Sequence, residues 1–380
     1  MVMRILQRLP FVAALLLLPA ALCAQKTKDT ILRKDGSRLR GVEIVDMDTQ
    51  KVVFKRGAEQ QELLASLVAG IEWGEPPETF RTGAAAEAKG EFDNAANLYQ
   101  EAAKTTERKP LQAEARFLAT RALVAAAARQ KDRAAAAVDA LKAFLKDYPT
   151  AWRLPEAKFL LGRALRLDGK AAEAEAALTE VETTAVKENW GVQWDARAKF
   201  EKALAQASQG KQADARSAFQ AVQGAVDAAV AQLGKPDSDL ERLKVEALIG
   251  AGETFVAENR LQDATDYWNR IGGTDKPAAI QAAALAGKGQ ALYLRAKAAK
   301  DEKLLREAQI ALAQANLLDG SNGDATAKAL YHLGLVVKAL GPAKEGDGAG
   351  QRARAYFEIV TRRHPQSAWA RLAQAEIDAK

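Results

Sequence analysis

The sequence has 380 residues, of which 48% are hydrophobic but only 6% aromatic, and its formal net charge is +6. Alanine is the most frequent apolar residue, which favours closely packed helices over β-sandwiches and barrels. Basic and acidic side chains are mixed along the chain, whereas nucleic-acid binders concentrate lysine and arginine on one face, so we expect no nucleic-acid partner.

The first 24 residues have the pattern of a secretory signal peptide. Arg4 and Arg8 form a charged start, residues 11–18 form an apolar stretch too short to span a bilayer, and small residues follow up to Ala24. We place cleavage after Ala24, with cleavage after Cys23 as the alternative. The sequence therefore predicts an exported protein, periplasmic or otherwise extracytoplasmic, with outer-membrane association left open. We expect no transmembrane segment in the mature chain.

Cys23 is the only cysteine of the sequence. It raises the alternative of cleavage before Cys23 and acylation of its thiol, as in a lipoprotein. The residue before an acylated cysteine is normally Gly, Ala or Ser, and here it is Leu22, so we expect no lipid anchor at Cys23. Without a cysteine pair, neither a disulfide nor a thiolate metal site is expected.

Residues 25–74 contain short runs with β character, at 30–32, 39–45, 52–54 and 71–73. Asp35-Gly36 provides a hairpin turn between the first two runs. Four or five short strands predict a small SH3-like or Sm-like β-barrel domain, with a β-hairpin that merely caps the first helices as the alternative. The stretch ILRKDGSRLRGV followed by VVFKRG resembles the small β modules that precede helical repeats in exported bacterial proteins.

Glu75-Pro76-Pro77 separates this region from residues 76–380, where helical periodicity takes over. A pattern of small residues, a turn glycine or asparagine and a bulky residue recurs there. Its clearest copies contain Gly83, Gly90, Ala95 and Tyr99; Gly162, Gly169, Ala174 and Leu178; Ala203, Gly210, Ala215 and Phe219; and Gly252, Asn259, Ala264 and Trp268. Small residues let two antiparallel helices approach closely, and the bulky residue one turn on fills the remaining gap.

This pattern resembles the tetratricopeptide repeat. Its second-helix alanines are Ala95, Ala137, Ala174, Ala215, Ala264, Ala308 and Ala353. They lie 37 to 49 residues apart, against 34 in the family. The sequence therefore predicts a mainly α protein: an α-solenoid of about seven tetratricopeptide-like helical pairs over residues 76–380, preceded by a small β-barrel-like domain. Pro149 and Pro365 end helices as in envelope tetratricopeptide proteins of Gram-negative bacteria, which supports the predicted compartment.

Residues for catalysis are scarce. The two histidines, His332 and His364, have no acidic residue at metal-ligand spacing, and we interpret both as structural. HExxH, GxSxG and P-loop motifs are absent from the sequence. We therefore predict that the protein is not an enzyme and has no cofactor and no metal site.

The resemblance implies that the first helix of each pair lines a concave groove. On that basis, the predicted partner-binding residues are Phe159, Arg163, Arg166, Arg197 and Phe200, which would hold an extended or helical peptide segment. For the two phenylalanines, packing between neighbouring repeats is the alternative. Trp190 and Trp194 are predicted to be core residues.

These observations predict a non-catalytic cell-envelope scaffold that mediates protein–protein interaction through the concave groove of its repeats. Two alternatives stay open. One is binding of peptidoglycan or another envelope polymer, and the other is a role as a non-catalytic subunit of an envelope enzyme or assembly complex.

Overall fold

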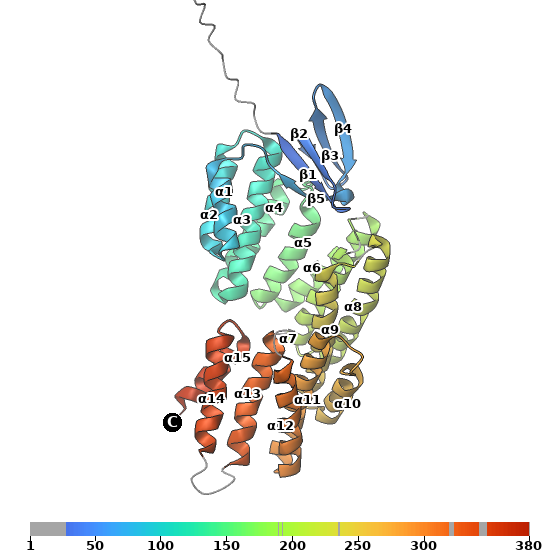
Figure 1. Ribbon diagram of the computed structural model, residues 1–380. Coiled ribbons are helices and arrows are strands. Elements are labelled where there is room, and N and C mark those ends of the chain that lie inside the picture. The colour runs from blue at the N-terminus through green and yellow to red at the C-terminus, as the bar shows by residue number, and fades with distance from the viewer. Residues whose placement is uncertain are drawn as a thin grey trace, which may run out of the picture.

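The computed structural model describes residues 28–188, 190–191, 193–234, 236–318, 323–341 and 348–379. The predicted signal peptide, its cleavage positions and Cys23 lie outside the described residues. Over the described part of the chain, a five-stranded antiparallel sheet is followed by fifteen α-helices (Figure 1). The predicted fold class is confirmed: the protein is an α-solenoid of tetratricopeptide-like hairpins preceded by a small β unit.

The strands are β1 (Asp29–Arg33), β2 (Arg38–Met47), β3 (Lys51–Arg56), β4 (Glu59–Leu64) and β5 (Val68–Glu72), and their order in the sheet is β4-β3-β2-β1-β5. A single-turn 3-10 helix, η1 (Ala65–Leu67), joins β4 to β5. Gly36 has a φ of 87° in the turn between β1 and β2, which a residue with a side chain rarely adopts. Asp35-Gly36 therefore forms the predicted hairpin turn.

The sheet curls because β2 belongs to two ladders. Its first half pairs with β1, its second half pairs with β3, and the register shifts between Ile44 and Asp46. Such an irregularity bends a strand. The bend encloses a small apolar core made of Ile31, Val42, Ile44, Met47, Val52, Phe54 and Val68. The sequence patterns did not mark β4, because this edge strand is polar and mostly exposed and so lacks buried alternation.

The helices follow in chain order. They are α1 (Glu78–Ala88), α2 (Phe92–Thr105), α3 (Lys109–Arg129), α4 (Ala134–Asp147), α5 (Leu154–Leu167), α6 (Ala171–Lys187), α7 (Gln193–Ser208), α8 (Gln212–Leu233), α9 (Ser238–Ala257), α10 (Leu261–Ile271), α11 (Ala278–Ala299), α12 (Glu302–Leu317), α13 (Gly323–Leu340), α14 (Ala349–Arg363) and α15 (Ala368–Asp378).

Consecutive helices from α1 to α14 pack in pairs as hairpins, and α15 follows the last pair. The seven alanines that mark the repeats lie one on each even-numbered helix, and all are at most 2% exposed. Gly90, Gly169 and Gly210 connect three of the pairs with a φ of 78°, and Asn259 adopts the same left-handed region at the corresponding turn. The repeated sequence pattern therefore corresponds to a repeated backbone geometry.

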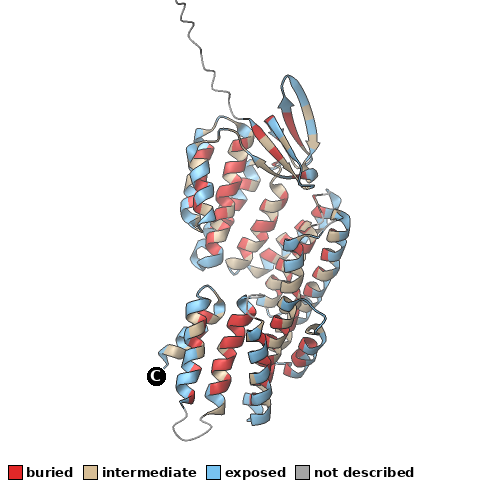
Figure 2. Ribbon diagram, viewed as in Figure 1, coloured by how far each residue is buried: buried red, intermediate tan, exposed pale blue. Residues whose placement is uncertain are grey.

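The odd-numbered helices from α3 to α15 also contact one another in succession, and they form the inner layer of the solenoid. The row of hairpins bends through α6–α10, so that the first and last hairpins lie on the same side of the bend (Figure 1). Figure 2 shows α13 buried along most of its length, whereas α12 and α14 expose their outer faces. α13 packs against four helices, α11, α12, α14 and α15, and the outer helices have fewer neighbours, which explains the difference.

Candidate partner-binding site

The β sheet is fixed to the solenoid by a buried aspartate. Asp29 is 2% exposed, and its carboxylate accepts the backbone amides of Ile44 at 2.9 Å and Gly74 at 2.7 Å. Arg108, just before α3, forms an ion pair with Asp29 and lies 5.2 Å from the ring centre of Trp73. A paired and hydrogen-bonded carboxylate tolerates such burial. The sheet is therefore held at one fixed position on the helices.

A second junction lies between α4 and α5. The amide of Thr49 donates to the carbonyl of Thr150 at 3.1 Å, and Asp48 and Ala151 form an isolated antiparallel bridge. Trp152, the next residue, packs partly into the apolar core of the sheet. Trp152 thus packs against the core of the sheet and lies two residues before the inner helix α5.

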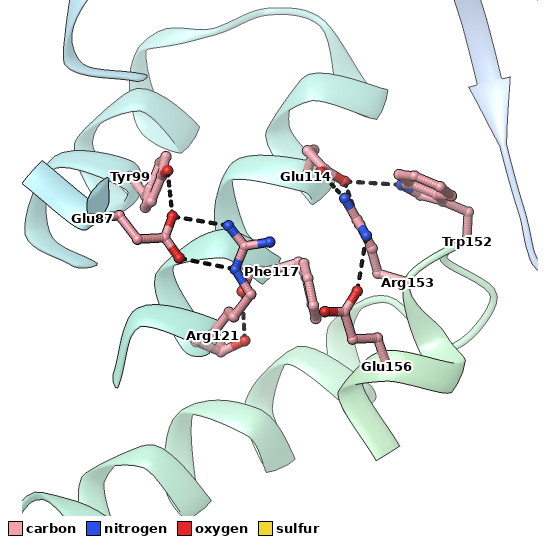
Figure 3. Close-up of polar contacts among 9 residues, drawn as sticks. Glu87, Tyr99, Glu114, Phe117, Arg121, Trp152, Arg153 and Glu156 are labelled. Atoms are coloured by element: carbon pink, nitrogen blue, oxygen red, sulfur yellow. Dashed lines mark hydrogen bonds and ion pairs between the residues drawn. The ribbon is translucent and has the colours of Figure 1, made fainter. Parts of the chain in front are cut away.

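A buried charge network fixes Trp152 and its neighbour Arg153 (Figure 3). The Trp152 indole Nε1 donates to Glu114 at 2.9 Å, and Arg153 donates to both oxygens of Glu114, at 2.7 and 3.1 Å. Arg153 also donates to Glu156 at 2.8 Å. Burial by itself lowers the pKa of the Arg153 guanidinium, but the charges of Glu114 and Glu156 raise it above its ordinary value. Arg153 therefore stays charged and joins α3 to α5.

A similar network occurs one hairpin earlier, also drawn in Figure 3. Arg121 on α3 donates to the two oxygens of Glu87 on α1, at 2.9 and 3.0 Å, and the Tyr99 hydroxyl donates to the same carboxylate at 2.8 Å. Burial and the hydrogen bond to Glu87 raise the pKa of Tyr99 above its ordinary value. The first three helices are thus connected through one carboxylate.

Between the sheet and the inner helices lies a cleft of about 480 Å³. One wall consists of the β1–β2 turn, η1 and the start of β5. The opposite wall consists of the starts of α5, α7 and α9 with the residues just before them, and the end of α8. Its volume falls in the range of small-ligand pockets. Its lining includes three tryptophans and four basic residues, contributed by both walls: Trp152, Trp190, Trp194, Arg33, Lys34, Arg153 and Arg197.

Two cations of this cleft affect one another. Burial lowers the pKa of the Lys34 ammonium, and the positive charge of Arg197 lowers it further. Arg197 lies over the Trp194 ring, 5.4 Å from its centre, and reaches Asp239 at 4.0 Å. A partly buried pair of like charges is unfavourable. The carboxylates of Glu156, Asp237 and Asp239 line the same cleft.

The five predicted partner-binding residues occupy three different environments. Arg197 lines the cleft. Phe159 is only 9% exposed and packs against Trp194 with 5.8 Å between ring centres. Phe200 packs against Phe219 of the outer helix α8 at 5.7 Å. The phenylalanine of α5 therefore supports a wall of the cleft from behind, as in the core alternative.

Arg163 and Arg166 both point to Glu201 on the next inner helix. Arg166 donates to Glu201 at 2.8 Å, and Arg163 lies 3.4 Å from its other oxygen. Burial raises the pKa of the nearby Glu246 carboxyl on α9, Glu201 raises it further, and Arg242 and Arg163 oppose this shift. We call Arg163, Glu201, Arg242 and Glu246 the inner charged cluster. It joins α5, α7 and α9 on the inner layer. Whether the five predicted residues bind a partner stays a prediction.

Sequence reasoning did not find the cleft. Trp190 and Trp194 are 7% and 9% exposed, in agreement with the predicted core role, yet both also line the cleft. Lys34 and Trp152 were not singled out, because they lie more than 100 positions apart and belong to different predicted units. The Trp152-Arg153 pair directly after the helix-ending Pro149 was the one available signal.

Outside the cleft, one histidine lies in the core. His332 is 4% exposed, its Nδ1 lies 2.9 Å from the Lys328 carbonyl, and burial followed by the Lys328 charge lowers its pKa to about 3. Within the described ranges, no group of three or more His, Cys, Asp and Glu side chains could hold a metal ion. Each helix in the same ranges is either too short or too polar to cross a membrane.

No family model matches the sequence, and a comparison with curated proteins gives no match. Solved structures share features of the fold. The apo form of the quorum sensor NprR from B. thuringiensis is 16% identical over 79% of this chain and 78% of that chain, with a TM-score of 0.45. The apo form of RapI is 12% identical over 78% and 79%, with a TM-score of 0.49.

A tetratricopeptide repeat protein from Parabacteroides merdae is 14% identical over 68% of this chain and 97% of that chain, with a TM-score of 0.32. These structural similarities give no information about a binding partner. The chain's own helices and their packing define the class: a helical-repeat protein, specifically an α-solenoid of tetratricopeptide-like hairpins with a β sheet at its N-terminal end.

Proposed function

We propose that the protein is a non-catalytic scaffold that binds a protein partner along the inner layer of its helices, with the cleft beside the sheet as the anchoring point. The observation that carries this proposal is the cleft itself. Trp152 and Arg153 in its lining are held by hydrogen bonds to the buried Glu114, and Trp194 packs against Phe159, so these side chains are fixed before a partner arrives. Pre-organised aromatic and arginine side chains are typical of binding hot spots.

The inner charged cluster extends the proposed surface along the solenoid. Arg163 is 41% exposed, Arg242 68% and Glu246 43%. Their mixed charges suit a partner with alternating charges and give orientation and selectivity more than affinity. The groove role of the repeats, implied by their resemblance to the tetratricopeptide family, is consistent with this surface.

The role of the sheet is part of the proposal. We propose that it is an SH3-like module, on the basis of its strand order and the 3-10 helix between β4 and β5. In this interpretation the module serves as one wall of the binding cleft. Asp29 and Arg108 keep that wall in place.

The compartment is also proposed, on the sequence pattern of residues 1–24. A charged start, a short apolar stretch and small residues up to Ala24 support export and a cell-envelope partner. Edman sequencing of the mature protein from an envelope fraction tests this. An N-terminus at Gln25 or Ala24 agrees with export, and an N-terminus at Met1 in a cytoplasmic fraction contradicts it.

The binding proposal is tested by affinity capture from envelope extract with the full chain and with the double variant Arg163→Ala, Arg242→Ala. Both arginines are substantially exposed, so the fold should persist, which circular dichroism checks. We expect one stoichiometric protein partner whose yield falls at least about tenfold with the variant. Equal capture by both proteins, or sedimentation of the wild type with purified peptidoglycan sacculi instead of protein capture, would contradict the proposal.

A further inference from the structure

The acidic residues of the cleft are engaged with the protein itself. The Asp237 carboxylate accepts the amides of Asp239 and Leu240 at 3.0 Å each and so caps α9. Glu156 accepts Arg153 at 2.8 Å. Asp239 lies 3.4 Å from Arg242 and reaches Arg197 only at the 4.0 Å limit of an ion pair. Arg197 therefore keeps donors that a ligand can use.

The cationic end of the cleft lies across the sheet–solenoid junction. Lys34 stands in the turn after β1, Arg197 stands in the second turn of α7, and both line the same cavity. Their charges repel one another in a partly desolvated place. A bound carboxylate between them would offset this repulsion.

The aromatic end lies directly beside the cationic end. The Trp194 ring lies between Phe159 at 5.8 Å and the Arg197 guanidinium at 5.4 Å, and this packing fixes both the ring and the cation. Trp152 is fixed by its bond to Glu114, and Trp190 completes the wall. An apolar side chain adjacent to an acidic one would meet rigid aromatic edges here.

We infer that the cleft binds an acidic segment of the partner protein, with one carboxylate seated between Lys34 and Arg197 and a neighbouring apolar side chain against Trp152, Trp190 and Trp194. This inference rests on the proposed function and names the chemistry of the partner at that site. The cavity of about 480 Å³ accommodates a short extended segment. The remainder of the partner would continue along the inner charged cluster.

The probe is an array of synthetic dodecapeptides that alternate Phe, Leu or Tyr with Glu, each paired with an identical peptide in which Gln replaces Glu. Fluorescence anisotropy with the full-length mature protein measures affinity at low and high salt. We expect Glu peptides to bind at least about tenfold more tightly than their Gln partners, and more weakly as salt rises. Binding should change the emission of the cleft tryptophans.

The variant Lys34→Gln, Arg197→Gln should abolish the preference for Glu over Gln. Arg306→Gln is the matched control, because Arg306 is 65% exposed on α12, away from the cleft, and pairs with Glu302. It should bind like the wild type. Equal affinity for Glu and Gln peptides, no binding by any Glu peptide, or unchanged selectivity in the double variant would each overturn the inference. Partner capture, measured separately with the Arg163→Ala, Arg242→Ala protein, would still decide the proposed function.

Discussion

The two halves of the solenoid use the same two kinds of contact in different proportions. From α1 to α7, successive inner helices are joined by buried ion pairs, among them Arg121–Glu87, Arg153–Glu114 and Arg166–Glu201. In the second half, the buried ammonium of Lys328 on α13 pairs with Glu253 on α9. In both halves, large side chains also pack directly onto glycines of a neighbouring helix, as Leu178 on α6 does onto Gly162 on α5. Trp268 on α10 lies against Gly252 on α9 and Gly287 on α11, and Phe357 on α14 lies against Gly334 on α13. The repeats share one sequence pattern, and ion pairs between inner helices are more frequent from α1 to α7 than from α9 to α14.

The difference has a functional side. Buried ion pairs hold charged and aromatic groups in fixed positions next to the sheet, where the cleft lies, whereas close apolar packing builds a rigid array without presenting such groups. Buried ion pairs contribute little net stability compared with apolar packing. Removing one partner is nevertheless strongly destabilising, because it leaves an unpaired buried charge. The N-terminal half is therefore suited to recognition.

The largest expected effect comes from Glu114→Ala. It leaves the Arg153 guanidinium, 17% exposed, without its main carboxylate and leaves the Trp152 indole unpaired. The free energy of unfolding should fall by about 3–5 kcal/mol. Hydrogen exchange should increase in α3 and α5 and stay unchanged in α11–α13. The double variant Glu114→Leu, Arg153→Met should lose much less, and an equal loss would show that charge burial is not the cause.

The next effect comes from Gly252→Ala in the C-terminal half. A methyl group at this position would overlap the Trp268 ring, so helices α9 and α10 must separate. We expect a loss of about 2–3 kcal/mol in chemical denaturation. Gly224→Ala on α8 is the matched control, since nothing lies within 4 Å of the added methyl, and it should stabilise by about 0.5–1 kcal/mol. Similar destabilisation by both variants would contradict the close-packing account.

A smaller effect concerns pH and also belongs to the C-terminal half. The pKa of His332 is about 3 in the folded protein and about 6.5 when unfolded. The unfolded state therefore binds the extra proton between these values, so stability is fully present above pH 6.5 and falls as pH decreases. The slope should be roughly 1 kcal/mol per pH unit. Denaturation of the wild type and His332→Gln at pH 7, 6 and 5 measures it; parallel curves would refute the assignment.

The smallest effect compares a helix cap beside the cleft with a helix cap far from it. Asp237 caps α9 beside the cleft, and Asp301 caps α12 far from it, each with two backbone amides. Asp237→Ala and Asp301→Ala should each cost about 1 kcal/mol in thermal unfolding. Only the first should tighten binding of the Glu peptides, because it removes a negative charge from the cleft. Equal binding by both variants would show that the charge of Asp237 does not affect the binding site.

Local patterns predicted much of the fold. Ala95, Ala174 and Ala264 lie on second helices with no exposed surface, and Asp35-Gly36 forms its turn, because these features depend on residues within one hairpin. The β4 strand was not predicted, since an edge strand in contact with water needs no apolar alternation. Phe159 shows the limit for the site: periodicity places it on the inner helix but cannot tell a groove position from contact with Trp194.

The sequence by itself determined the class of fold, the repeat positions and the scarcity of catalytic residues. Only the tertiary structure decided that Lys34, Trp152 and Arg197 line one cleft. The physical reason is the distance along the sequence between the residues that must come together. Helix pairing is set by small residues 10 to 20 positions apart, whereas the cleft depends on how three hairpins stack and on where Asp29 and Arg108 dock the sheet.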